Sequence, residues 1–84
     1  MKEETLEIRY LGGPLDGWRE SAVPDEVEQL RQVQGGQLHV DHTVEDESPA
    51  LRHVYIPARG TIFPVTTRLA MVYRGPEVLI DDSL

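Results

Sequence analysis

The sequence predicts an α+β fold that is mostly β: a small antiparallel sheet or partly open barrel of five to six strands, with one short helix after strand two. Several short runs alternate apolar with polar residues, as half-buried strands do. One stretch alone, residues 25–34, has the apolar spacing of a helix face. Glycine and proline separate these runs. With 84 residues, the chain is expected to form a single domain, residues 1–84.

The charge balance narrows the classes of partner. The chain has 15 acidic and 8 basic residues and a net charge of −7, which argues against direct binding to nucleic acid or to an anionic membrane. It contains no cysteine, so no disulfide, thiolate metal site or cysteine nucleophile is expected. No apolar run reaches the roughly 18 residues of a membrane span. We expect a cytoplasmic protein without a cofactor.

The first hairpin is organised by the turn Gly12-Gly13-Pro14-Leu15-Asp16-Gly17. Residues 5–11 alternate as a strand, residues 18–23 form a second one, and the short connection predicts antiparallel pairing. The two glycines would allow main-chain N–H groups to approach an anion. Proline and the Asp-Gly pair instead favour a structural turn, and we expect that role to dominate.

A short helix is predicted over residues 25–34. Pro24 ends the preceding strand, Asp25 and Glu28 have the spacing of an acidic capping box, and Gly35-Gly36 provides a stop. Its apolar face consists of Val27, Leu30 and Val33.

The second half returns to strand patterns, over residues 37–44, 51–57 and 66–73, with residues 61–65 crossing between the last two. Both faces of the strand over residues 51–57 are partly apolar, so the sequence does not decide which of the two faces packs on the core. Arg74-Gly75-Pro76 is expected to end the strand over residues 66–73. The final run, residues 77–80, either closes its own sheet or adds to the sheet of a second copy, which is our main reason to expect a homo-oligomer.

Catalytic groups are sparse. His39 and Asp41 share one strand face, and His53 could face them, which would suit a metal-dependent hydrolase. No established metal or nucleophile motif supports this, so we predict no catalytic residue, no metal site and no enzymatic activity.

Arginine and aromatic residues recur along the strands. Seven of the eight basic residues are arginine, whose planar guanidinium binds phosphate and carboxylate groups in a bidentate manner. Aromatic rings can stack on a nucleotide base. Arginines in surface salt bridges and aromatic rings in the core would give the same pattern. The ligand-binding residues predicted on this basis are Arg9, Tyr10, Gly12, Gly13, Trp18, Arg19, Arg52, Tyr55, Arg68, Tyr73 and Arg74.

Three segments, Tyr10 to Gly17 (Y-x-G-G-P-x-D-G), His53-Val54-Tyr55 and Met71 to Gly75, resemble small uncharacterised proteins of tailed phages and prophages. The resemblance implies a phage accessory context, with the host cytoplasm as location. It implies no activity and no functional residues.

These observations lead to two hypotheses of function besides the remote hydrolase. The first is a non-enzymatic accessory protein that binds a small anionic, nucleotide-like ligand between subunits, for example to sequester a host defence signal. The alternative is an acidic protein-protein inhibitor or adaptor, with the segment Glu45-Asp46-Glu47 meeting a basic patch on a host enzyme.

Overall fold

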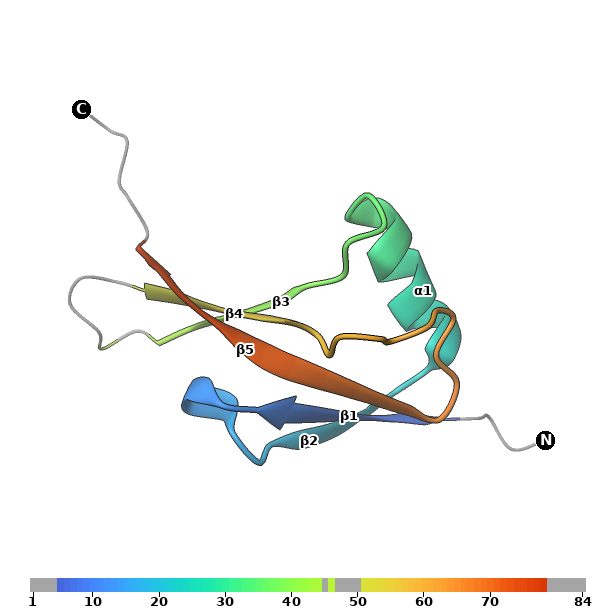
Figure 1. Cartoon of the computed structure of the whole chain (residues 1–84), viewed down its shortest axis with the longest axis horizontal. Helices are drawn as coiled ribbons and strands as arrows, with labels where there is room; N and C mark the ends of the chain where they lie inside the picture. Colours follow the sequence, from blue (N-terminus) through green and yellow to red (C-terminus); the bar gives the residue numbers. More distant parts are fainter. Residues whose placement is uncertain (1–4, 45, 47–50, 79–84) are drawn as a thin grey trace.

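Five strands form one curled sheet, a half-barrel, with a helix after the second strand (Figure 1). The computed structural model describes residues 5–44, 46 and 51–78, without the side chain of Val78. The elements are β1 (Leu6–Leu11), the 3-10 turn η1 (Gly13–Leu15), β2 (Arg19–Ala22), α1 (Pro24–Val33), β3 (Val40–Thr43), β4 (Leu51–Pro57) and β5 (Arg68–Val78). The predicted α+β fold, mostly β with a helix after strand two, is confirmed.

The strand order is β2-β1-β5-β4-β3. Antiparallel pairing joins β1 to β2, β3 to β4, and β4 to β5. In contrast, β1 and β5 pair in parallel, which the sequence pattern did not predict. The chain leaves the first hairpin through α1, so β5 reaches the free side of β1 after a long crossover, as parallel pairing requires. The outermost strands of the described sheet are therefore β2 and β3.

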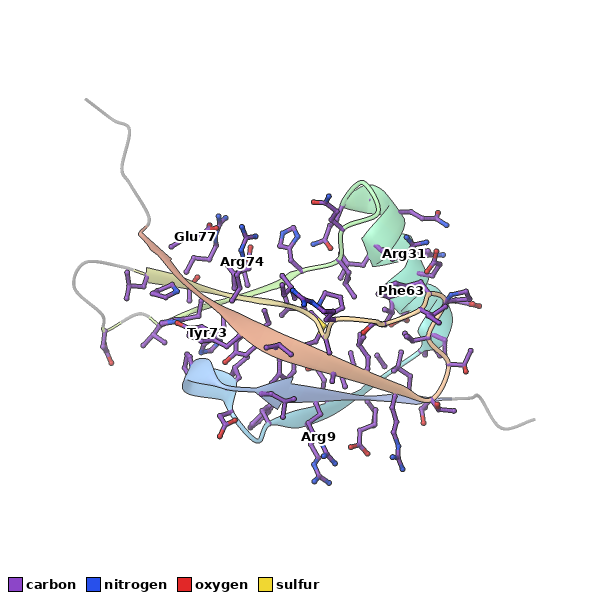
Figure 2. All side chains as sticks on the ribbon, viewed as in Figure 1. Arg9, Arg31, Phe63, Tyr73, Arg74 and Glu77 are labelled. Carbon is purple, nitrogen blue, oxygen red and sulfur yellow. The ribbon has the colours of Figure 1, made fainter. Side chains whose placement is uncertain are left out.

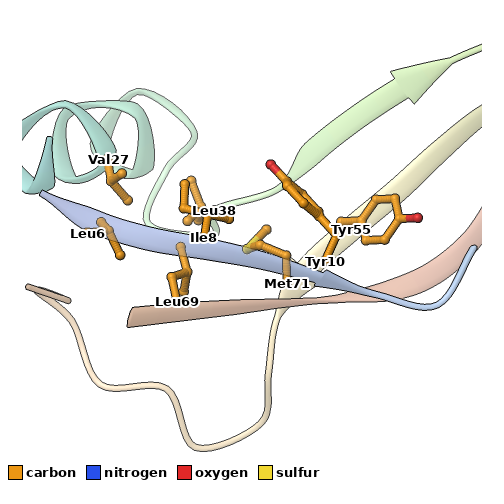
Figure 3. Packing of buried hydrophobic residues seen from close by; sticks show 8 residues of the cluster. All are labelled: Leu6, Ile8, Tyr10, Val27, Leu38, Tyr55, Leu69 and Met71. Atoms are coloured by element: carbon orange, nitrogen blue, oxygen red, sulfur yellow. The ribbon is translucent and has the colours of Figure 1, made fainter. Parts of the chain in front are cut away.

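The core lies on the concave face of the sheet, and Figure 3 shows its members close together between β1, β5 and α1. Tyr55, Leu6 and Met71 are the largest fully buried side chains. In β4, His53, Val54 and Tyr55 are all buried, so the middle of this strand is covered on both faces. The open question about the core face of residues 51–57 is thus answered: Tyr55 faces the core, and Val54 is covered on the outer face. The buried apolar cluster is Leu6, Ile8, Tyr10, Val27, Leu38, Tyr55, Leu69 and Met71.

The helix begins one residue earlier than predicted. Val23 occupies the N-cap position with extended dihedral angles, and Pro24 is the first helical residue. Proline suits this position because its fixed φ matches the helix and its missing N–H would have had no partner there. The expected capping box at Asp25 is therefore wrong, although Asp25 and Glu26 still place negative charge in the first turn, where the helix dipole favours it.

The predicted end of the last long strand is also wrong. Instead of stopping before Arg74-Gly75-Pro76, β5 continues through them to Val78 and stays paired with β4. A register shift beside Val54 and a Gly75 φ of 137° accommodate the irregularity. Pairing with β1 ends at Val72, so beyond that point β5 is an edge strand that tolerates proline. The first two residues of the predicted final run, Glu77 and Val78, thus belong to β5, and Leu79 and Ile80 lie outside the described residues.

Candidate functional site

The glycine turn packs directly on two tyrosines, Tyr73 from the neighbouring strand β5 and Tyr55 from β4. Gly12, Gly13 and Gly17 have φ values of 83°, 63° and 82°, which favour glycine. A Cβ atom at Gly13 would lie 2.5 Å from Cδ1 of Tyr73 and 2.7 Å from the Tyr55 hydroxyl oxygen. The Asp16 carboxylate accepts a hydrogen bond from the Gly12 N–H at 2.7 Å. The turn therefore requires glycine for both close approach and backbone conformation.

Tyr55 fixes this turn by hydrogen bonds. Its hydroxyl donates to the Gly12 carbonyl at 2.6 Å and accepts from the Leu15 N–H at 2.8 Å. The three segments of the phage resemblance thus meet at one place, because the turn contacts Tyr55 from the second segment and Tyr73 from the third. This arrangement supplies a structural reason for Gly12 and Gly13 in this chain.

The tyrosines belong to an aromatic array on the concave face. The rings of Tyr10 and Tyr55 are 5.2 Å apart at 84°, and those of Tyr55 and Tyr73 are 5.3 Å apart. Tyr73 and His53 continue the array through a 2.8 Å hydrogen bond between the hydroxyl oxygen and Nδ1. Tyr10 and Tyr55 are buried, so their ring faces are used by the core.

Tyr10 has a polar contact at the open side of the half-barrel. Its hydroxyl donates to a Glu20 carboxylate oxygen at 2.7 Å. Burial raises the pKa of the Tyr10 phenol well above its ordinary value, and the hydrogen bond to Glu20 raises it further. The phenol is therefore a neutral donor at physiological pH.

Three of the predicted arginines gather on the outer face, opposite the core. Arg9 and Arg19 are direct cross-strand neighbours on β1 and β2, and Arg68 on β5 is opposite Glu7. Glu7 is 3.5 Å from Arg9 and 3.9 Å from Arg19. Figure 2 shows Arg9 extending away from the sheet. We call Arg9, Arg19 and Arg68 the arginine patch.

A hollow of about 130 Å³ opens within this patch. It is lined by Arg9, Arg68, Glu7, Leu69 and Ala70, and Ala70 is the direct neighbour of Arg9 on β5. Three cations with one carboxylate give this region an excess of positive charge in a chain whose net charge is −7.

An exposed apolar strip adjoins the arginine patch. Leu11 on β1 pairs with Val72 on β5, which in turn pairs with Ile56 on β4. All three side chains are exposed, and they lie on the face that carries Arg9 and Ala70. The outer face thus combines guanidinium groups with an uncovered apolar surface.

The other two predicted arginines, Arg52 and Arg74, line a different hollow of about 300 Å³. Arg52 forms an ion pair with Glu77 and lies 3.7 Å from Asp41. Its hydrogen bond to Glu77 raises the pKa of Arg52 and lowers that of Glu77. Figure 2 shows Arg74 beside Glu77. Carboxylates balance the cations here, so this hollow is a weaker anion site than the arginine patch.

The histidines proposed for a metal-dependent hydrolase are not brought together. Asp41 pairs with Val54 and His42 with His53, so His53 and Asp41 lie on opposite faces. His39 and Asp41 are 3.9 Å apart on the outer side. In the part of the chain that the structure describes, no group of three or more His, Cys, Asp or Glu side chains is placed to hold a metal ion.

The sequence analysis missed a long hollow on the concave side, which we call the trough. One part, of about 190 Å³, lies between α1 and the sheet, and the other, of about 440 Å³, lies beside the glycine turn. Glu20 and Val40 line both parts. Trp18 borders the second part with 59% of its surface exposed. Only the curl of the sheet brings β2 and β3 to the same hollow, so no local pattern could have indicated it.

Of the predicted ligand-binding residues, the structure therefore unites Arg9, Arg19 and Arg68, and places Arg52 and Arg74 at a second hollow. Gly12, Gly13, Tyr55 and Tyr73 form the packed turn, while Tyr10 and Trp18 border the trough. The guanidinium groups and the aromatic rings lie on opposite faces of the sheet.

Comparisons with protein-family models, curated proteins and solved structures give no match. Within residues 5–44, 46 and 51–78, no helix is long and apolar enough to cross a membrane.

Proposed function

We propose that this chain is a non-enzymatic binding protein for a small anionic, nucleotide-like ligand held on the outer face of the sheet. The observation that carries the proposal is the arginine patch, in which Arg9 and Arg68 line one hollow and Arg19 is the cross-strand neighbour of Arg9. Guanidinium groups bind phosphate in a bidentate manner and remain charged at any physiological pH. The ligand phosphate lies in this hollow.

The neighbouring apolar strip provides a surface for the rest of the ligand. Leu11, Val72 and Ile56 are exposed next to the patch and can cover the face of a base or ribose. The overall negative charge repels anions at long range. Affinity must therefore come from short-range hydrogen bonds to the guanidinium groups, and it falls as salt screens them.

The resemblance to phage proteins supports an accessory role, in which the protein sequesters a nucleotide signal of host defence. A homo-oligomer belongs to the same proposal. Trp18 is exposed on the face opposite the arginine patch, so a ligand that contacts both must lie between two copies. Native mass spectrometry of the purified protein, with and without nucleotide, reports subunit number and co-purified ligand together.

Calorimetric titration with ATP, cyclic AMP and cyclic dinucleotides tests the proposal. Arg9→Gln and Arg68→Gln are each expected to weaken binding by about tenfold, the loss of roughly one charge-assisted hydrogen bond. Arg59→Gln is the matched control, because Arg59 is exposed in the loop after β4 and outside the patch. Absence of binding by every nucleotide, or equal losses in all three variants, would overturn the proposal.

A further inference from the structure

The trough lies between two strand edges that have no neighbour in the described sheet. The sheet begins with β2 and ends with β3, and both strands contribute side chains to the same hollow. An edge strand presents unpaired N–H and C=O groups, which a further strand can use. The curl of the sheet therefore leaves an apolar hollow with a ready main-chain template along its side.

The orientation of the β2 main chain follows from its neighbours. Tyr10 N–H donates to the Trp18 carbonyl at 3.0 Å, and Glu7 N–H donates to Thr67 on the opposite side at 3.0 Å. The main-chain N–H and C=O groups of successive residues point to opposite sides of a strand, so those of Glu20, two residues after Trp18, point toward β1. Arg19 and Ser21 then turn theirs toward the open edge. The side chains of Glu20 and Ala22 line the trough.

The lining of the trough fits apolar side chains of an added strand. Trp18, Leu15 and Tyr10 border one part, and Leu30 and Val40 border the hollow beside α1. Trp18 and Leu30 are exposed despite their large apolar surfaces. A strand that pairs with β2 directs every second side chain into this hollow, where it covers these groups.

Charge selects the kind of segment. Glu20 lines both parts of the trough, and Glu26 lines the part beside α1. Among the described lining residues of both parts there is no lysine or arginine. An acidic C-terminal segment of a second copy, such as Asp81-Asp82, would be repelled. Lysine or arginine side chains at trough-facing positions of an incoming strand, placed between apolar ones, would meet these carboxylates.

We propose that the trough binds an extended segment of a partner protein, which adds as a strand to the free edge of β2 and whose trough-facing side chains, one at every second residue, are apolar and basic in turn. Main-chain hydrogen bonds to Arg19 and Ser21 hold the segment, apolar side chains fill the trough, and the carboxylates bind its cationic side chains. This site is separate from the arginine patch and does not depend on a nucleotide ligand. It assigns a binding surface to the adaptor alternative that does not require the segment Glu45-Asp46-Glu47, of which only Asp46 is described.

A synthetic peptide tests the proposal with the full chain. The probe is acetyl-(Val-Ser-Lys-Ser)4-amide, the Lys-Val peptide, in which the valine and lysine side chains share one face of the strand, and Trp18, the single tryptophan, reports binding by its fluorescence. We expect an emission shift toward shorter wavelength as Trp18 is covered. The Glu-Val peptide, which has glutamate in place of each lysine, is expected not to bind, and neither is the Lys-Val peptide with N-methyl groups on alternate residues of its pairing edge.

Protein variants locate the site. Ser21→Pro removes the N–H from the free edge and is expected to weaken peptide binding by about tenfold, whereas Ser21→Ala keeps that N–H and binds like the wild type. Trp18→Ala, followed by calorimetry, is expected to weaken binding similarly without unfolding, since Trp18 is exposed. Glu20→Gln weakens binding, whereas Glu7→Gln on the opposite face does not.

The binding results show whether the trough takes a basic strand, an acidic one or none. Equal binding of the N-methylated peptide would show that no strand is added and overturn the proposal, as would equal binding of the Glu-Val peptide. No binding of the Lys-Val probe by a folded wild-type protein would also overturn it. Peptide binding that persists in the nucleotide-binding variants Arg9→Gln and Arg68→Gln, as expected, keeps this result independent of the proposed function.

Discussion

Gly13→Ala perturbs the contact that joins the glycine turn to the rest of the sheet. The new methyl group would stand 2.5 Å from Cδ1 and 2.7 Å from Cγ of Tyr73, and 2.7 Å from the Tyr55 hydroxyl oxygen. Comfortable separations between carbon atoms are about 3.5 to 4.0 Å. The turn must therefore move by about 1 Å, away from hydrogen bonds of 2.6 and 2.8 Å that fix it to Tyr55.

Two effects add in this variant. An alanine in the left-handed conformation costs about 1 to 2 kcal/mol, and overpacking costs about 1 to 3 kcal/mol. The expected loss of unfolding free energy is thus about 2 to 5 kcal/mol. A chain of 84 residues has about 4 to 13 kcal/mol in total, so the variant loses a large part of its stability, with a Tm lower by about 8 to 40 °C.

Gly17→Ala is the matched control, because Gly17 also has a positive φ, of 82°, but nothing lies within 4 Å of the position that a Cβ atom would take there. It is expected to lose the conformational part alone, about 1 to 2 kcal/mol. Thermal melts followed by circular dichroism compare the two variants. Equal melting temperatures would refute the close packing of Gly13 on Tyr73 as the reason for glycine at this position.

Three further predictions concern individual side chains. Tyr55→Phe removes both hydrogen bonds to the turn and is expected to lower the unfolding free energy by about 1 to 3 kcal/mol, measured by urea denaturation. The raised pKa of Tyr10 stabilises the fold below pH about 10, the ordinary phenol value, and this stability is lost as pH rises toward the folded pKa. Melts above pH about 10 should therefore show falling stability, and a smaller fall in Tyr10→Phe. The hydrogen bond from Arg52 lowers the pKa of Glu77, so the Glu77 carboxylate stabilises the fold at neutral pH and loses this effect when it is protonated in acid. Glu77→Gln should therefore lower the urea midpoint slightly at pH 7, and the midpoints of the variant and the wild type should become equal in acid.

Local sequence patterns predicted the structure correctly where it depends on residues within one segment. The alternation of Leu6, Ile8 and Tyr10 placed these side chains in the core of β1, and the glycine turn gave the expected antiparallel hairpin. The helix after Pro24 formed within one residue of the predicted bounds. Its N-cap was wrong because proline can itself begin a helix, a preference that outweighed the capping box.

Contacts between distant segments were beyond these patterns. The extension of β5 through Pro76 depended on where its pairing with β1 ends, at Val72, which is a property of register and not of composition. The convergence of Tyr55 and Tyr73 on the glycine turn likewise required the strand order. Sequence reasoning identified these residues but had no means to show which of them the core would use.

The sequence by itself determined the fold class, the first hairpin, the single helix and the excess of arginine over lysine, because each depends on residues close together in the chain. The tertiary structure alone decided which side chains share a face. Strands that lie far apart in the sequence pair in parallel, and their register unites Arg9 with Arg68 on the outside while the tyrosines face inward. The curl of the sheet then creates the trough between β2 and β3, because curvature arises from the whole sheet and from no single strand.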